Sequence, residues 1–398
     1  DASNKGTASI VEGTTVNLTA TAPVTTNTYK VVWLDGATTV KTDTIGAGQT
    51  STTSSYSITN MSAAHDIRVL YTQLYELIVQ KTGDGASDSK ATVSAVVKDA
   101  ENNTYELSNG VAYVPAGTTA VVTANAAAGG NPYRVSSNVA AGSLDGKHDL
   151  IPTSTAAAAY TFPAETINAK TTIRIEFTRL YKLTYSLVDS VTGAAIAAQA
   201  TESGSTSKAI TSPAYMPKNT VVEFTVTPSG EDYIHAYSLN GGTTYTIGTL
   251  PSQTVTADTD IKVKVVNSRN VTINVPDPTV ATLTATYTFP GVSGSKTLTI
   301  AATAGPQSFK LPQGATITVT ANILDSKDKF TDFTVTGSTE VTQVADNKSA
   351  AVVVQGENIT ITPNIAIMSV AECAQEILNG SNVSFYAGNK WGNSKIYY

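Results

Sequence analysis

The sequence predicts an all-β protein: a linear array of four small Ig-like or β-sandwich-type modules, followed by a short C-terminal helix and strand. Three observations predict this fold. Apolar and polar residues alternate over many segments of strand length. One such alternating pattern recurs at four places along the chain. Each recurrence also contains a strand that follows a turn residue tolerant of positive φ.

The composition is typical of a strand-rich exported protein. Of the 398 residues, 41% are hydrophobic but only 14% are charged, below the roughly 25% that is usual in soluble domains. A net charge of −6 without a basic run argues against nucleic acid or anionic lipid as a partner. No apolar run is long enough to span a membrane, and the first residues do not resemble a signal peptide. We therefore expect a processed, secreted protein that is extracellular or at the cell surface.

The four repeats meet where one alternating stretch runs directly into the next. In residues 171–188 the alternation ends at Phe177 and resumes at Tyr181. The same joint recurs at 65–79, at 260–275 and, more weakly, at 357–370. Adjoining modules should therefore be stiffly connected. The predicted modules are 1–72, 73–178, 179–267 and 268–367, with a helix-strand tail at 368–398.

Each module contains a turn followed by an alternating strand, and then an aromatic residue that opens a further strand. The turn positions expected to need positive φ are Gly13, Gly117, Asn219 and Gly314. The aromatic positions are Tyr29, Tyr133, Tyr233 and Phe330.

The first module has the most specific pattern, with Gly13-Thr-Thr-Val-Asn-Leu-Thr-Ala-Thr21, then Trp33-Leu-Asp-Gly36, then a closing stretch at 56–69. This order resembles the divergent internalin B-type repeat, a module found in tandem in bacterial surface proteins. The resemblance covers nearly all of residues 1–367, although modules two to four lack the Trp and carry longer loops. It implies a surface role and names no ligand.

The first module is predicted to lack its two opening strands. Modules two to four each begin with a strand and then a second pairable stretch, at 91–98, 194–200 and 281–289, whereas about a dozen residues precede Gly13. After the last joint, Ser369-Val-Ala-Glu372 predicts a capping box that opens a short helix. Residues 382–398 then read as an extended strand.

We therefore expect the tail of one subunit to complete the first module of the next, which would build a homopolymer by donor-strand complementation. The alternatives are that the tail folds back on its own fourth module, and that the chain is a piece of a longer array. The donor residues are Val383, Phe385, Ala387, Trp391, Ile396 and Tyr398. The acceptor groove is assigned to Ile10, Val16, Leu18, Trp33, position 68 (Arg68, beside Ile67) and Leu70.

The predicted function is a structural subunit of an extracellular filament, pilus or surface layer. The alternative is a cell-surface adhesin or carbohydrate-binding stalk, whose partners would be cell-wall or host glycans. An enzyme is not expected, because His65, His148 and His235 fall in three different modules and should be loop or surface residues. Cys373, the single cysteine, excludes intrachain disulfides and should be buried as a small hydrophobe.

No metal ligand is assigned, and calcium is the only cofactor that loop aspartates suggest. None of these aspartates follows the spacing of a known calcium loop. The aspartate groups are Asp84 with Asp88, Asp145 with Asp149, Asp258 with Asp260, and Asp325 with Asp328 and Asp332. Asn-x-Ser/Thr sequons predict candidate glycosylation sites at Asn17, Asn60, Asn102, Asn270, Asn347, Asn358, Asn379 and Asn382.

Overall fold

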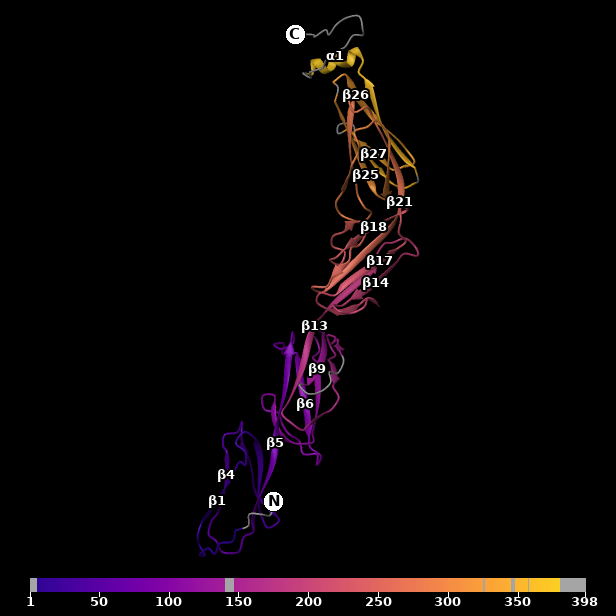
Figure 1. Ribbon diagram of the computed structural model, residues 1–398. Coiled ribbons are helices and arrows are strands. Elements are labelled where there is room, and N and C mark those ends of the chain that lie inside the picture. The colour runs from indigo at the N-terminus through magenta and orange to yellow at the C-terminus, as the bar shows by residue number, and fades with distance from the viewer. Residues whose placement is uncertain (1–5, 140–146, 325, 345–347, 357, 380–398) are drawn as a thin grey trace. The chain divides into compact units, whose positions relative to one another are not determined.

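The computed structural model describes residues 6–139, 147–324, 326–344, 348–356 and 358–379. Within these ranges the regular structure is β-strand apart from one nine-residue helix, α1 (Val370–Leu378) (Figure 1). The predicted all-β fold and its short C-terminal helix are confirmed. The strand predicted after the helix lies outside the described residues. The chain divides into two compact units, Asp1–Leu180 and Tyr181–Tyr398.

Each unit contains two hydrophobic cores, and each core lies between two β-sheets. We call the four resulting sheet pairs modules one to four, in chain order. The cores form because apolar and polar side chains alternate along the strands, so that one face of each sheet is apolar. In β8 (Thr118–Ala126), for example, Ala120, Val122 and Ala124 are buried and the residues between them are half-buried. The bounds predicted for the modules stay predictions.

The described strands of the first unit are β1 to β12 and the first part of β13. In module one, one sheet pairs β1 (Val16–Thr21) with β4 (Thr53–Ile58), and the other has the order β3 (Thr38–Gly46), β2 (Thr28–Asp35) and β5 (Ile67–Gly83). In module two, one sheet has the order β7 (Val111–Pro115), β5, β13 (Thr171–Leu187), β9 (Tyr133–Val139) and β10 (His148–Leu150). The other sheet has β6 (Ala91–Lys98) on one edge of β8 and both β11 (Ala158–Thr161) and β12 (Glu165–Ile167) on the opposite edge.

The second unit repeats this plan. In module three, one sheet has the order β16 (Ala214–Pro217), β13, β21 (Thr259–Val275), β18 (Tyr233–Ser238) and β19 (Thr246–Ile247), and the other has β15 (Lys208–Ile210), β14 (Ala195–Thr201), β17 (Val221–Thr227) and β20 (Gln253–Thr254). In module four, one sheet has β24 (Gly305–Pro312), β21, β29 (Ile359–Ile367) and β26 (Asp328–Thr336), and the other has β23 (Lys296–Leu298), β22 (Ala281–Tyr287), β25 (Thr316–Ile323), β28 (Ser349–Val353) and β27 (Val341–Val344).

The first three predicted joints are single strands, not pairs of strands. β5, β13 and β21 each run for 17 residues, a length of about 56 Å at roughly 3.3 Å per residue. The first half of each strand closes one module, and the second half opens the next. No turn interrupts any of these three strands.

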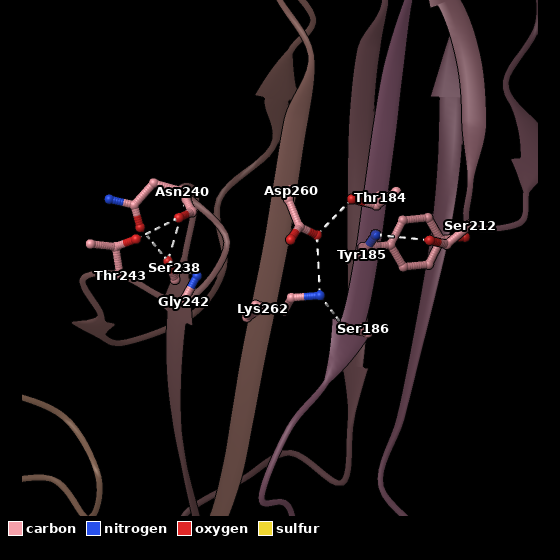
Figure 2. Close-up of polar contacts among 10 residues, drawn as sticks. All are labelled: Thr184, Tyr185, Ser186, Ser212, Ser238, Asn240, Gly242, Thr243, Asp260 and Lys262. Carbon is pink, nitrogen blue, oxygen red and sulfur yellow. Dashed lines mark hydrogen bonds and ion pairs between the residues drawn. The ribbon is translucent and has the colours of Figure 1, made fainter. Parts of the chain in front are cut away.

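In modules two and three, successive shared strands pair in parallel. Val79 of β5 lies opposite Ile173 of β13, and Tyr185 of β13 lies opposite Ile261 of β21. Figure 2 shows the polar face of the second ladder. There the Asp260 carboxylate accepts a hydrogen bond from the Thr184 hydroxyl at 2.6 Å and lies 3.2 Å from Lys262 Nζ. Lys262 Nζ also donates to Ser186 Oγ at 3.1 Å. This bond and the Thr184 bond link β13 to β21 on the polar face of the ladder.

The predicted turn residues have the backbone conformation that their position requires. Gly13, Gly117, Asn219 and Gly314 have φ values of 87°, 82°, 69° and 80°, the left-handed region that favours glycine and asparagine. Each residue ends the turn that precedes β1, β8, β17 or β25. The turn predictions are therefore confirmed in all four modules.

The capping box predicted for α1 is present. The Ser369 amide and hydroxyl donate to Glu372 Oε2 at 2.9 and 2.8 Å, and the Glu372 amide donates back to Ser369 Oγ at 3.3 Å. Lys329 of β26 donates to Glu372 Oε1 at 2.7 Å. The Lys329 bond and the bonds from Ser369 lower the pKa of Glu372 to about 2. Cys373, in the same turn, is buried as predicted.

We expect α1 to lose stability in acid through this one carboxylate. Its folded pKa lies below the ordinary value of 4.5, so its contribution is complete above pH 4.5 and is lost as the pH falls toward 2. Hydrogen exchange of the Cys373 amide, which donates to the Ser369 carbonyl at 3.0 Å, should report the loss. The Glu372→Gln variant should show weaker protection at neutral pH and little further change in acid. Equal pH dependence in both proteins would contradict this assignment.

Candidate functional site: open strand edges of module one

In module one, one edge of each sheet is left uncovered where the other modules have a further strand. The first half of β5 pairs with β2, and no other strand in the described part of the chain lies on its second edge. In modules two to four the equivalent edges of β13, β21 and β29 are covered by the preceding shared strand. β1 likewise pairs with β4 alone, whereas β8, β17 and β25 are also paired on their other edge. These uncovered edges form the candidate site.

The strand registers establish which residues are equivalent across modules. Tyr29, Tyr133 and Tyr233 lie opposite Gln73, Arg179 and Asn267 respectively. Two residues before these partners lie Tyr71 in module one, Phe177 in module two and Val265 in module three. These three residues are therefore equivalent.

Exposure at these equivalent positions reflects the missing neighbour. Phe177 and Val265 are completely buried, whereas Tyr71 is 39% exposed. Next to Tyr71, the Leu70 side chain is 50% exposed. An unpaired strand edge beside exposed apolar side chains is a template for pairing with another segment.

The predicted acceptor residues lie in three different environments. Val16 and Leu18 are half-buried on β1, and Ile10 is 39% exposed in the segment before it. Arg68 and Leu70, predicted to line the groove, lie instead on the outer face of β5, where Arg68 donates a hydrogen bond to the Gly36 carbonyl. Their neighbours Ile67 and Val69 pack against the core. Because successive strand residues face opposite sides, an error of one position exchanges the two faces.

Trp33, the sixth predicted acceptor residue, is a core residue. It is only 2% exposed and packs against Tyr56, with the ring centroids 5.8 Å apart. Its indole N–H donates to Ser54 Oγ at 2.7 Å, and the Ser54 hydroxyl donates to Asp43. Burial raises the pKa of Asp43, but the hydrogen bonds from Lys41 and Ser54 outweigh this and leave it lowered. Trp33 therefore belongs to the core of module one and does not line an open groove. The predicted donor residues, Val383 to Tyr398, lie outside the described residues.

Polar contacts hold the beginning of β5 in place. His65 Nδ1 lies 2.5 Å from Asp35 Oδ2, and the Asp66 amide donates to Asp35 Oδ1 at 3.1 Å. The hydrogen bond from His65 is the largest cause of the lowered pKa of Asp35. His65 is an exposed loop residue, as predicted. His148 and His235 differ from the prediction, since both are half-buried on strands.

Two of the aspartates considered for calcium accept hydrogen bonds from backbone amides of β13. Asp84 accepts a hydrogen bond from the Arg179 amide at 2.8 Å, and Asp258 accepts one from the Lys182 amide at 2.9 Å. Both bonds therefore hold the middle of β13. Among the described residues, no group of three or more His, Cys, Asp and Glu side chains could hold a metal ion. Asp145 and Asp325 lie outside those residues.

The sequons that the structure describes lie at the surface. The asparagine side chains that are exposed are Asn17, Asn60, Asn102, Asn270, Asn358 and Asn379. Asn347 and Asn382 lie outside the described residues. Accessibility is necessary for glycosylation, so these six stay candidate sites. In the described ranges no helix combines the length and apolar character that crossing a membrane requires.

Comparison with known proteins finds neither a family nor a curated relative. No protein-family model matches the chain, and no curated protein matches it. Among solved structures, the chain is similar to the pilus adhesin SpaC from Lactobacillus rhamnosus GG at 12% identity and a TM-score of 0.21, covering 90% of this chain and 57% of SpaC. This chain therefore spans little more than half the length of SpaC.

Two further structures show likeness of the same kind. A bacterial adhesin from Mobiluncus mulieris is 12% identical with a TM-score of 0.21, covering 71% of this chain and 100% of that one. BcpA, the major pilin subunit of Bacillus cereus, is 8% identical with a TM-score of 0.15, covering 73% of this chain and 99% of BcpA. At TM-scores this low, the likeness carries no inference about what this chain binds or builds.

Proposed function

We propose that this protein is a structural subunit of an extracellular filament, pilus or surface layer, and that copies of it join by adding a strand to module one. The observation that carries the proposal is the uncovered edge of β5, where Tyr71 is 39% exposed and its equivalents in modules two and three are fully buried. The shared strands β5, β13 and β21 also suit a load-bearing part, because each continues through two modules without a turn.

The repeat architecture specifies how the added strand would lie. In modules two to four, the beginning of β13, β21 or β29 pairs in parallel with the end of the preceding shared strand. At the same register position in each module, that preceding strand places an apolar residue opposite an isoleucine: Val79 opposite Ile173, Tyr185 opposite Ile261, and Ile273 opposite Ile361. Ile67 is the equivalent position in module one. The donor strand is therefore parallel to β5, with an apolar residue opposite Ile67 and another two positions later.

The proposed donor is the C-terminal segment of another copy. Val383, Phe385 and Ala387 alternate with polar or less apolar residues in the sequence, which is the pattern that a strand with one buried face requires. A head-to-tail contact of this kind leaves the next acceptor and donor available, so growth continues into a fibre. Copies of the same chain are then the principal partner.

Deletion of residues 382–398 tests the proposal. We expect the full chain to form fibres by negative-stain electron microscopy, and the deleted chain to remain monomeric by sedimentation. Adding a synthetic peptide of residues 380–398 to the deleted chain should slow hydrogen exchange at the amides of residues 67–73, and a peptide carrying Val383→Ser and Phe385→Ser should not. Fibres that grow undiminished without residues 382–398 would overturn the donor assignment.

A further inference from the structure

The segment before the turn at Gly13 has a strand as its counterpart in each of the other three modules. In every module the amide of the turn residue donates to a backbone carbonyl at 2.7–2.9 Å, so the four turns are equivalent. Three residues before the turn residue stand Ile10, Val114, Met216 and Leu311. The last three lie in β7, β16 and β24, whereas residues 6–11 belong to no strand.

The exposure of these equivalent residues shows what module one lacks. Val114, Met216 and Leu311 are 0%, 3% and 1% exposed, whereas Ile10 is 39% exposed. In modules two to four the segment pairs with a shared strand, and its apolar residues belong to the core. In the described part of the chain, no shared strand precedes module one. Residues 7–10 therefore lack the strand with which their counterparts pair.

The sequence of the segment suits an outer strand. Apolar Ala8 and Ile10 alternate with polar Thr7 and Ser9, the pattern of a strand with one buried face. β7 has the same alternation of burial, with Ala112 in the place of Ala8. The segment thus carries the inward-facing residues that its position requires.

The other modules show where the missing strand lies. In module two the second half of β5 lies between β7 and β13, antiparallel to β7 and parallel to β13. In module four β21 lies between β24 and β29 in the same way. The equivalent place in module one lies between residues 7–10 and the first half of β5. A strand bound there has a partner on both of its edges.

The register of module two transfers to module one. Leu77 lies opposite Ala112, and two residues later β5 lies opposite Ile173. Ala8 and Ile67 are the equivalents of these two partners. A strand that occupies the vacant place therefore has one residue opposite Ala8 and, two positions later, one opposite Ile67.

The residue opposite Ala8 is aliphatic and buried in the other modules. Its counterparts are 0%, 1% and 0% exposed, and they are Leu77, Leu183 and Val271. In the proposed donor, Val383 is aliphatic and Phe385 follows two positions later. Module three has the same combination, with Tyr185 two positions after Leu183. This match assigns Val383 to the place opposite Ala8 and Phe385 to the place opposite Ile67.

We propose that residues 7–10 are a clamp strand, which pairs antiparallel with the donor strand of another copy and holds it against β5. Val383 of the donor lies opposite Ala8, and Phe385 lies opposite Ile67. Ala8 and Ile10 become buried when the donor binds, as their counterparts are in module two. The inference rests on the tail-mediated assembly proposed above, and it gives the donor main-chain hydrogen bonds on both edges, which supply affinity in strand addition.

Backbone direction in module two identifies which amides of the clamp strand face the donor. The Val79 amide donates to the Gly110 carbonyl at 2.8 Å, so Gly110 faces β5. Ala112, two residues later, faces β5 as well, whereas Pro115 stands at an odd spacing and directs its nitrogen away. By equivalence the Ala8 amide faces the donor.

Two proline variants of the full chain test the clamp strand. Ala8→Pro removes an amide that pairs with the donor, so fibre growth measured by light scattering should slow about tenfold or more. Val11→Pro should grow as the unaltered chain does, because the equivalent residues of the other modules are Pro115, Pro217 and Pro312. Equal growth of the two variants would overturn the clamp strand.

The same substitutions should leave the free module intact. Ala8 and Val11 are exposed, so neither proline should change the urea midpoint of module one. In the chain that ends at residue 381, Trp33 is the single tryptophan and its fluorescence reports that midpoint. Slower growth of Ala8→Pro is then a loss of donor binding and not a loss of fold.

Hydrogen exchange distinguishes failure of the clamp strand from failure of the donor assignment. When a peptide of residues 380–398 binds the chain that ends at residue 381, the amides of Ala8 and Ile10 should slow together with those of residues 67–73. Slowing at residues 67–73 alone would leave the donor assignment in place and show that the clamp strand is wrong. If neither set slows, the donor assignment fails as well.

Disulfide trapping checks the register. Ile78 lies opposite Val111 in module two, which places Ser384 of the donor opposite Thr7. The Thr7→Cys chain should cross-link to a Ser384→Cys peptide in oxidised glutathione, and at least about fivefold more slowly to an Asn382→Cys peptide, because the directly opposite pair has the shorter Cα separation. Faster cross-linking of the Asn382→Cys peptide would overturn the assignment of Val383 to Ala8.

Discussion

Replacing Phe177 with alanine is expected to lower the free energy of unfolding of module two by about 3–5 kcal/mol, because a large buried side chain is lost and a cavity is left in a packed core. Phe177 is completely buried, and its ring meets Tyr133 edge-to-face with the centroids 5.5 Å apart. The exchange rate of the Val135 amide, in the neighbouring strand β9, reports the stability of module two when it is measured at increasing urea concentrations.

The matched control is Tyr71→Ala, at the equivalent position of module one. The Tyr71 side chain is 39% exposed and keeps an edge-to-face contact with Tyr29 at 6.3 Å. Its loss should cost about 1 kcal/mol in the free monomer, since much of its surface is already in water. In an assembled fibre the cost should approach that of Phe177→Ala. Equal losses at the two positions in the monomer would contradict the uncovered edge of β5.

The second large effect is expected from Gly46→Ala in module one. Gly46 ends β3 with φ of 107°, and an added Cβ would lie 2.1 Å from the Asn27 carbonyl oxygen. A methyl group cannot occupy that position unless the backbone of two paired strands separates. Combined with the cost of a left-handed conformation, the substitution should destabilise module one by about 3 kcal/mol or more.

Gly36→Ala provides the comparison within the same module. Gly36 also has a positive φ, 59°, but nothing lies within 4 Å of an added Cβ. Only the conformational cost of about 1–2 kcal/mol should then remain. The fluorescence of Trp33 during urea unfolding reports on this core, in a Trp391→Phe background that leaves Trp33 as the single tryptophan. A smaller loss for Gly46→Ala than for Gly36→Ala would show that the close approach to Asn27 is absent.

Local features of the structure were predictable wherever the sequence pattern was unambiguous. The turn at Gly117 and the strand Ala91–Lys98 follow from turn chemistry and from period-two alternation. In β5, however, Val69, Leu70 and Tyr71 are consecutive apolar residues. Alternation alone does not say which of them faces inward, and the prediction chose the wrong face at Leu70.

The sequence by itself determined which segments are strands, where the turns lie, and that one module plan recurs, because these depend on residues close together in the chain. Only the tertiary structure decided that each joint is a single strand with parallel neighbours, and which edges stay uncovered. Those outcomes depend on partners as distant in sequence as Leu77 and Thr171. A strand edge is closed or open according to whether such a partner reaches it, and alternation within the strand is the same in either case.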